Sequence, residues 1–247
     1  MIYPFSNRIS GCLLTALALM QLVPELKAIV PGAKVPRSAE TQSAANPNPT
    51  VFPPFSSPHG HTYAEWNEKW WKFVLALPVN QNPILGADCS IGQSGPVWFL
   101  VGGPPTINCA VPAGKSLFFP IVNAECSTLE LDPFFGATPA ERAACAKSFM
   151  DGATGLTATI DGVSIQNLMA YQSASSDFDF TVPDHNILFV PGLGAASGKS
   201  SANGFYLMLA PLSAGAHTIH FAGMAGIPGN PSSPFTIDTT YSLTVGR

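Results

Sequence analysis

The pattern of apolar and polar positions predicts one amphipathic helix near the start of the ordered chain. Between residues 63 and 77 apolar side chains recur every three or four positions, and the charged side chains occupy the opposite face. The apolar face consists of Tyr63, Trp66, Trp70, Phe73, Val74 and Leu77. Thr62, followed three residues later by Glu65, forms a capping box, which predicts that the helix begins at residue 63.

After Pro78 the helical period gives way to runs typical of strands, and these favour a mainly β fold. The runs lie at residues 95–101, 115–122, 177–182, 204–223 and 235–245, several of them alternating between apolar and polar positions. Asp161-Gly162, between two further runs, predicts a hairpin turn, and Thr138-Pro139 begins a second capped helix. We expect an antiparallel β-sandwich, jelly-roll-like, with one or two flanking helices.

The N-terminal residues predict export. Arg8 precedes an apolar run at residues 11–23, which is too short to span a bilayer and ends at Pro24. This is typical of a signal peptide, and we place it at residues 1–28. Cys12 lies at the beginning of the apolar run rather than after it, so we do not expect it to carry a lipid.

Residues 29–58 are rich in proline, serine and asparagine, which predicts a disordered linker. A second small-residue cleavage site, Ser43-Ala44-Ala45, lies too far from the apolar run to be preferred. The remaining residues, 59–247, are enough for a single domain. They contain no run near the roughly 20 apolar residues that cross a membrane, so we expect no membrane partner after processing.

Charge and cysteine content narrow the class of protein further. Residues 59–247 hold seven Lys and Arg against thirteen Asp and Glu, a balance that disfavours nucleic acid as a partner. Removal of Cys12 with the signal leaves an even set of cysteines: Cys89, Cys109, Cys126 and Cys145. In a secreted or periplasmic protein these predict two disulfides. Three connectivities are possible, and we prefer Cys89–Cys109 with Cys126–Cys145 because each closes a short local loop.

Four stretches carry a resemblance to a group of uncharacterised secreted bacterial proteins. They are TYAEWNEKWW, GQSGPVWFL, VPAGKSLFFPIVNAEC and PLSAGAHTIHFAG, which cover the ordered region in patches. The resemblance implies secretion and a shared fold. It implies no activity, because none is known for the group.

The first of these stretches also invites a metal-site interpretation. His59, His61 and Glu65 have the spacing of the first metal-binding motif of cupins, but Glu65 is already used by the helix cap. We therefore expect no metal and no cofactor. His217 and His220 fall on opposite faces of one strand, and His217 is expected to be a hydrogen-bonded core residue.

Acidic residues offer two candidate sites. Asp177, Asp179 and Asp184 can supply oxygens to calcium, although the first two also suit the solvated face of a strand. In LFFPIVNAEC, strict alternation places Asn123 and Glu125 on the side of Phe119, at the end of an apolar stripe where the pKa of a carboxyl can be raised. Glu125 is then either an acceptor for backbone amides beside Cys126 or a catalytic acid.

Two classes of function follow. The first is a secreted binding or structural module for a glycan or peptide, with Trp71, Trp98 and Asn123 as candidate ligand-binding residues. The alternative is a glycosidase-like hydrolase in which Glu125 pairs with an Asp from another strand. No nucleophile elbow or metal motif favours the hydrolase, so the binding module is preferred.

Overall fold

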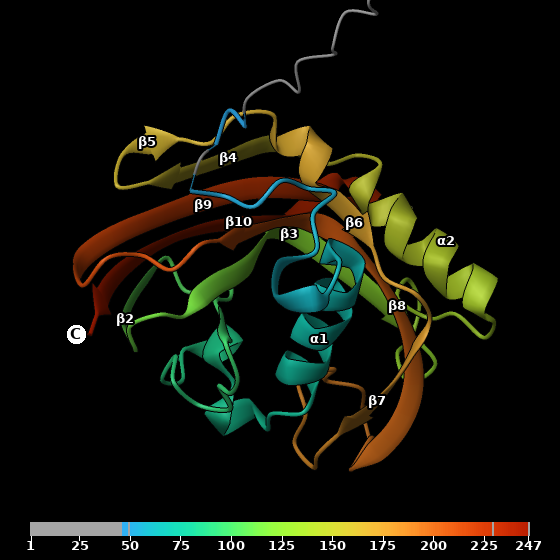
Figure 1. Ribbon diagram of the computed structural model, residues 1–247. Coiled ribbons are helices and arrows are strands. Elements are labelled where there is room, and N and C mark those ends of the chain that lie inside the picture. The colour runs from blue at the N-terminus through green and yellow to red at the C-terminus, as the bar shows by residue number, and fades with distance from the viewer. Residues whose placement is uncertain (1–45, 49, 229, 247) are drawn as a thin grey trace, which may run out of the picture. The chain divides into compact units, whose positions relative to one another are not determined.

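A computed structural model describes residues 46–48, 50–228 and 230–246 of the chain. The predicted signal peptide and the larger part of the predicted linker lie outside these residues. The described chain is mainly β, with two five-stranded sheets and two α-helices (Figure 1). Within it, no helix is long and apolar enough to cross a membrane.

The first sheet has the strand order β1-β3-β8-β6, and a further strand, β7, also pairs with β8. The strands are β1 (Val97–Phe99), β3 (Ser116–Ser127), β6 (Gln172–Ala174), β7 (Phe178–Val182) and β8 (Ala196–Leu209). The second sheet has the order β2-β10-β9-β4-β5. It contains β2 (Thr106–Val111), β4 (Thr154–Ile160), β5 (Val163–Ser164), β9 (Gly215–Ile227) and β10 (Asn230–Val245).

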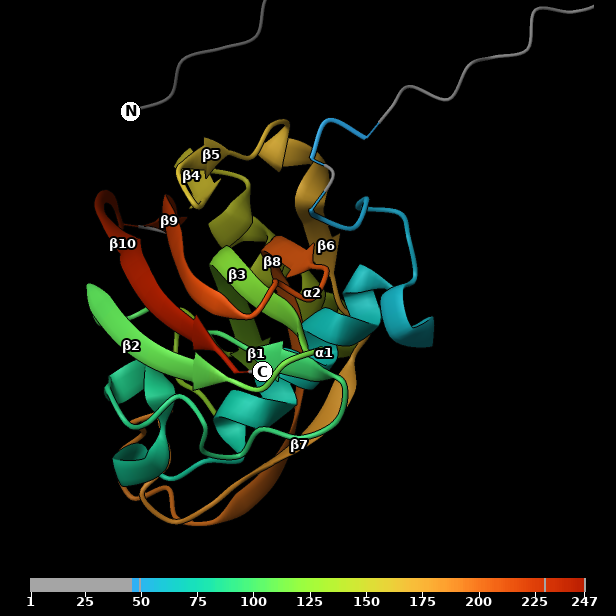
Figure 2. The same cartoon turned by 60° about the vertical axis from the view of Figure 1, so that its left-hand side comes forward.

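The expected mainly β fold is confirmed, but both sheets are mixed and not antiparallel throughout. β1 runs parallel to β3, and β2 runs parallel to β10, as Figure 2 shows from the side of β2. The reason lies in the connections. The chain leaves β1 for β2 in the other sheet before it returns as β3, and such a crossover can bring the strand back in the same direction.

The first sheet is covered on both faces. Helix α1 (Tyr63–Leu75) packs on one face, where Tyr63 and Trp66 contact the ring of Phe118. On the other face Phe119 stacks on Phe221 of β9, with ring centroids 4.8 Å apart. Helix α2 (Pro139–Met150) lies outside β8, on the side away from α1 (Figure 1). Burial on both faces explains why β3 is a nearly continuous apolar run rather than an alternating one.

Helix α1 begins at Tyr63 with the predicted capping box, and a separate 3₁₀ turn at Pro58–Gly60 precedes it. The Thr62 side chain accepts from the Glu65 amide, and the Glu65 carboxylate accepts from the Thr62 amide at 2.7 Å. The tryptophans of α1 are tied to the backbone around them. The indole N–H of Trp70 donates to the Leu100 carbonyl at 2.8 Å, and that of Trp66 donates to the Pro58 carbonyl at 3.0 Å.

Both predicted disulfides are confirmed in their connectivity. Cys89–Cys109 joins the loop before β1 to β2, with Cα atoms 5.8 Å apart. Cys126–Cys145 joins the end of β3 to α2 across a Cα separation of 6.0 Å. The predicted Asp161-Gly162 hairpin turn is also present between β4 and β5, with positive φ at both residues.

Residues before His59 also pack on the domain, so the predicted end of the linker at residue 58 lies too far along the chain. Val51 is 1% exposed and bridges to Leu209 at the end of β8. The Phe52 amide donates to the Met208 carbonyl at 2.9 Å, and the Tyr63 hydroxyl donates to the Phe52 carbonyl. The end of the proline-rich stretch is therefore docked on the sheet, with Val51 and Phe52 among its contacts.

Candidate functional site

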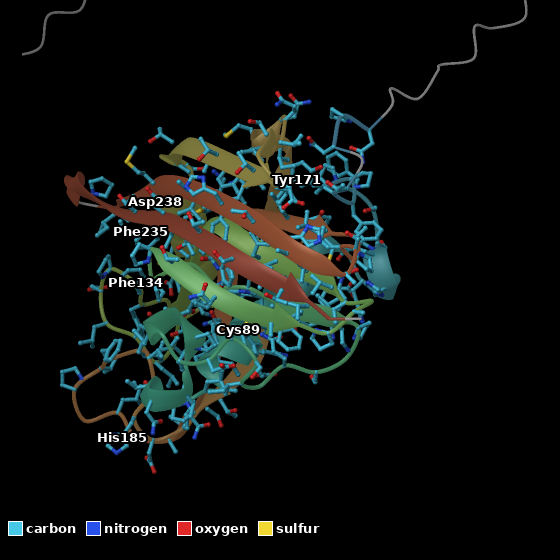
Figure 3. The ribbon with its side chains drawn as sticks, turned by 90° about the vertical axis from the view of Figure 1, so that its left-hand side faces the viewer. Cys89, Phe134, Tyr171, His185, Phe235 and Asp238 are labelled. Atoms are coloured by element: carbon cyan, nitrogen blue, oxygen red, sulfur yellow. A yellow bond between two sulfur atoms is a disulfide. The ribbon has the colours of Figure 1, made fainter. Side chains whose placement is uncertain are left out.

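An apolar cavity of about 290 Å³ lies beside the edge of β3. β1 pairs with β3 only at residues 116–118, and beyond them this edge has no strand neighbour in the described chain. The cavity walls include the rings of Trp71, Phe134 and Phe235. Figure 3 shows Phe134 and Phe235 on the same side of the molecule, Phe235 on β10 and Phe134 in the loop that follows β3. The polar part of the wall consists of Asn123, Glu125 and Glu130.

A β-bulge orients the polar residues of β3. The pairing of β3 with β8 shifts by one residue between Pro120 and Val122. The bulge reverses the alternation expected from the sequence, so Asn123 reaches the α1 side and not the side of Phe119. Glu125, two residues further on, shares that side by alternation and lines the same cavity.

The side chain of Glu125 is only 3% exposed. Ser200 on β8 donates a short hydrogen bond to its Oε2 atom. The other oxygen, Oε1, is buried and receives no hydrogen bond from the described residues. Of the two oxygen atoms of this carboxyl group, Oε2 therefore has a hydrogen-bond donor on β8 and Oε1 has none from the described residues.

Glu130 supplies the second carboxyl group, from the loop that follows β3. This loop turns back at once: the Ser127 hydroxyl donates to Glu130 Oε2 at 2.9 Å and accepts from the Leu129 amide. The turn brings the Glu130 carboxyl beside Glu125, into the wall of the same cavity. Two carboxylates cannot donate to each other, so the contact is favourable only if the pair retains a proton.

The surroundings favour that proton. Burial raises the pKa of Glu125 above its ordinary value, and burial raises the pKa of Glu130 as well. The nearby charge of Glu125 raises the pKa of Glu130 further. Within the described part of the chain, neither carboxyl forms an ion pair with a Lys, Arg or His. The pair therefore holds a proton to higher pH than free glutamates do, and within the described residues no cation stabilises its charge.

A buried network fixes the cavity wall opposite the pair. The Tyr206 hydroxyl donates to Asn67 Oδ1 at 2.6 Å and accepts from the indole N–H of Trp71 and the amide of Asn123, each at 3.2 Å. Burial raises the pKa of Tyr206, so its phenol stays a neutral donor. The two wall residues, Trp71 and Asn123, are therefore held in place, with the indole N–H of Trp71 and one N–H of Asn123 occupied.

The predicted ligand-binding residues separate into two places. Trp71, Asn123 and Glu125 meet at the cavity. Trp98 does not line it and is only 7% exposed, so it offers little surface to a ligand. The expected partner for Glu125, an Asp on another strand, is wrong as well. The second carboxylate is Glu130, and the Ser127-x-x-Glu130 spacing was the signal in the sequence that this side chain turns back.

The three aspartates proposed for calcium are engaged separately. Arg142 donates to both oxygens of Asp177 at 2.7 and 2.9 Å, and Lys199 pairs with Asp179 at 2.6 Å. Asp184 accepts from the Ala195 amide in its own loop. Among the described residues, no group of three or more His, Cys, Asp and Glu side chains is arranged to hold a metal ion.

His217 belongs to a cluster that superficially looks like a catalytic triad. Its Nδ1 lies 2.7 Å from Asp161 Oδ2, while Nε2 lies 2.9 Å from the Ser213 carbonyl and 3.4 Å from the Ser213 hydroxyl. Both ring nitrogens therefore face acceptors and both must carry protons, which leaves no lone pair to act as a base. Asp161 raises the pKa of His217 accordingly. The predicted hydrogen bonding is confirmed, but the ring joins two turns at a sheet end rather than lying in the core.

Comparisons with known proteins add little to this geometry. No family model and no curated protein matches the chain. The solution structure of amebosin is similar to 62% of this chain and 99% of its own, at 15% identity and a TM-score of 0.18. At that TM-score the likeness carries no argument about fold or function.

Proposed function

We propose that the protein is an extracytoplasmic binding module that holds a small, mostly apolar molecule in the cavity beside β3. The observation that carries this proposal is the cavity of about 290 Å³, whose wall is mainly apolar and contains one cluster of polar groups at Asn123, Glu125 and Glu130. Ligand sites commonly combine apolar walls with a few convergent polar groups and residues of shifted pKa. The apolar wall favours such a molecule over a glycan or an extended peptide.

Other features are consistent with this proposal. Two disulfides suit an oxidising compartment outside the cytoplasm, and the predicted signal peptide would lead there. The two stacked sheets, with α1 and α2 on their flanks, are compatible with an open sandwich that carries its site at a strand edge. Sites of this kind are set by local side chains rather than by the fold.

The glycosidase alternative is less well supported by the carboxyl pair. Retaining glycosidases hold their two carboxyl groups about 5–5.5 Å apart, and inverting ones about 6.5–9.5 Å apart. Glu125 and Glu130 lie close enough for the charge of Glu125 to raise the pKa of Glu130. A pair this close suits the sharing of a proton.

A neutral fluorescent probe tests the binding function. N-phenyl-1-naphthylamine brightens when it leaves water, so we expect saturable enhancement on titration with the folded protein. Leu188 lines the cavity from a loop, and Leu188→Trp should fill the space and weaken probe binding at least about tenfold. Val163→Trp, at an exposed apolar position on β5, is the matched control and should leave binding unchanged. Equal binding by both variants would place the probe elsewhere and reject the proposal.

A further inference from the structure

The hydrogen bonds around the cavity are one-sided. Most donors that the polar wall residues could offer are occupied within the protein, and the second N–H of the Asn123 amide is the exception. The N–H groups of Trp71 and Asn123 bind Tyr206, and the hydroxyls of Ser200 and Ser127 bind the two carboxyl groups. What remains open is a set of acceptors.

Two of these acceptors stand out. Glu125 is only 3% exposed, and its Oε1 atom receives no hydrogen bond from the described residues. Oδ1 of Asn123 receives no hydrogen bond within the described chain either, because only the amide nitrogen of this side chain is engaged. Both residues follow the bulge of β3 on the same side of the strand and line the same cavity. A buried acceptor left without a donor costs about 1–3 kcal/mol, and more if it is charged.

Charge points in the same direction as the acceptors. The pair can carry one or two negative charges, and within the described residues no cation contacts it. An isolated carboxylate in an apolar wall is costly, but the cost falls when a cation with its own hydrogen-bond donors enters. The rings of Trp71, Phe134 and Phe235 line the same space, and aromatic faces attract organic cations.

We propose that the cavity binds an organic ammonium ion with a small apolar body, such as an arylalkylamine, whose N–H groups donate to Glu125 Oε1 and Asn123 Oδ1. This inference rests on the proposed binding function and names its ligand class. An anion is disfavoured because the wall offers it a single free N–H, that of Asn123, beside the negative charge of the pair. A neutral alcohol brings a single donor and leaves the charge of the pair uncompensated. A divalent metal is disfavoured, since the wall is mainly apolar and supplies few oxygens.

Calorimetric titration at pH 7 with three ligands of similar size tests the inference on the unmodified protein. The ligands are 2-phenylethylamine, which is an ammonium ion at this pH, 2-phenylethanol, which is neutral, and 3-phenylpropanoate, which is an anion. We expect the ammonium ion to bind at least about tenfold more tightly than the alcohol, and the anion not to bind measurably. Alcohol binding as tight as ammonium binding, or no ammonium binding, overturns the inference.

Variants locate the effect at the pair. Glu125→Gln nearly keeps the shape of the side chain but cannot carry charge, so the preference for ammonium over alcohol should disappear. Glu68→Gln is the matched control, because it removes the same charge from an ion pair with Lys72 on α1, outside the cavity. An ammonium affinity unchanged by Glu125→Gln overturns the inference. If that variant fails to fold, the comparison of the three ligands on the unmodified protein still decides.

The neutral probe separates the two proposals. Probe binding in the cavity without any ammonium preference rejects the ligand class and leaves the binding function standing. Failure of both the probe and the ammonium ion rejects the binding function together with its ligand class.

Discussion

At the scale of single residues, Glu125 and Glu130 make stability depend on pH. A carboxyl whose pKa is raised by folding keeps a proton that the unfolded chain gives up, so the folded state binds more protons. Its stabilising effect is complete below the pKa of an unfolded Glu, about 4.3, and is lost as pH rises toward the raised folded value. For each proton retained, stability should fall by about 1.4 kcal/mol per pH unit in that window.

We therefore expect the free energy of unfolding, measured with urea between pH 5 and pH 8, to decrease as pH rises. Glu130→Gln should make the curve flatter and raise stability at pH 8, because the amide stays neutral and can still donate to Glu125. Asp161 raises the pKa of His217, so this residue also makes the free energy of unfolding fall as pH rises. The difference between variants therefore isolates the contribution of the carboxyl pair. Glu68→Gln should leave the slope unchanged. A slope identical in Glu130→Gln and the unmodified protein would count against the shared proton.

At the scale of elements, helix α1 connects the N-terminal cap to the cavity. It places Trp71 and Leu75 in the cavity wall, and its first turn depends on the reciprocal bonds of Thr62 and Glu65. Thr62→Ala should lower the free energy of unfolding by about 1 kcal/mol through the lost cap. Thr138→Ala, at the equivalent capping box of α2, should cost a similar amount, and urea denaturation of both variants checks this. A cost near zero for Thr62→Ala alone would mean that α1 is held by packing without its cap.

The elements also show where sequence reasoning succeeds and where it stops. Helix caps, the Asp161-Gly162 turn and local disulfides depend on residues close in sequence, so their patterns were readable. The bulge near Ile121 is set by the pairing with β8, about 80 residues away, and a shift of one residue there turned Asn123 to the other side. The parallel pairing of β2 with β10 likewise depends on a distant partner, whereas that of β1 with β3 depends on the crossover through the other sheet. The alternation of strand residues does not predict the position of Glu130, because a turn and not a strand sets it.

At the scale of the whole molecule, two disulfides join elements that also meet in the core. Thiol titration of the mature protein under denaturing, non-reducing conditions should find no free cysteine, because Cys12 leaves with the predicted signal peptide and the other four are paired. Each bond closes a loop of about 20 residues and should contribute about 3 kcal/mol to stability. One free thiol would show that Cys12 is retained. Two or more would contradict the pairing.

The place of β10 within its sheet has a consequence for the order in which the domain can assemble. β10 is the last described strand in sequence, yet it lies between β2 and β9 and pairs with both. Its partner β2 is separated from it by more than half of the chain, and pairing over such a distance closes a long loop and folds slowly. A chain still emerging from the ribosome therefore has β2 and β9 with open edges until the final strand arrives. Cooperative folding must wait for residues 230–245, so a truncation before them removes an inner strand of a sheet rather than an edge strand.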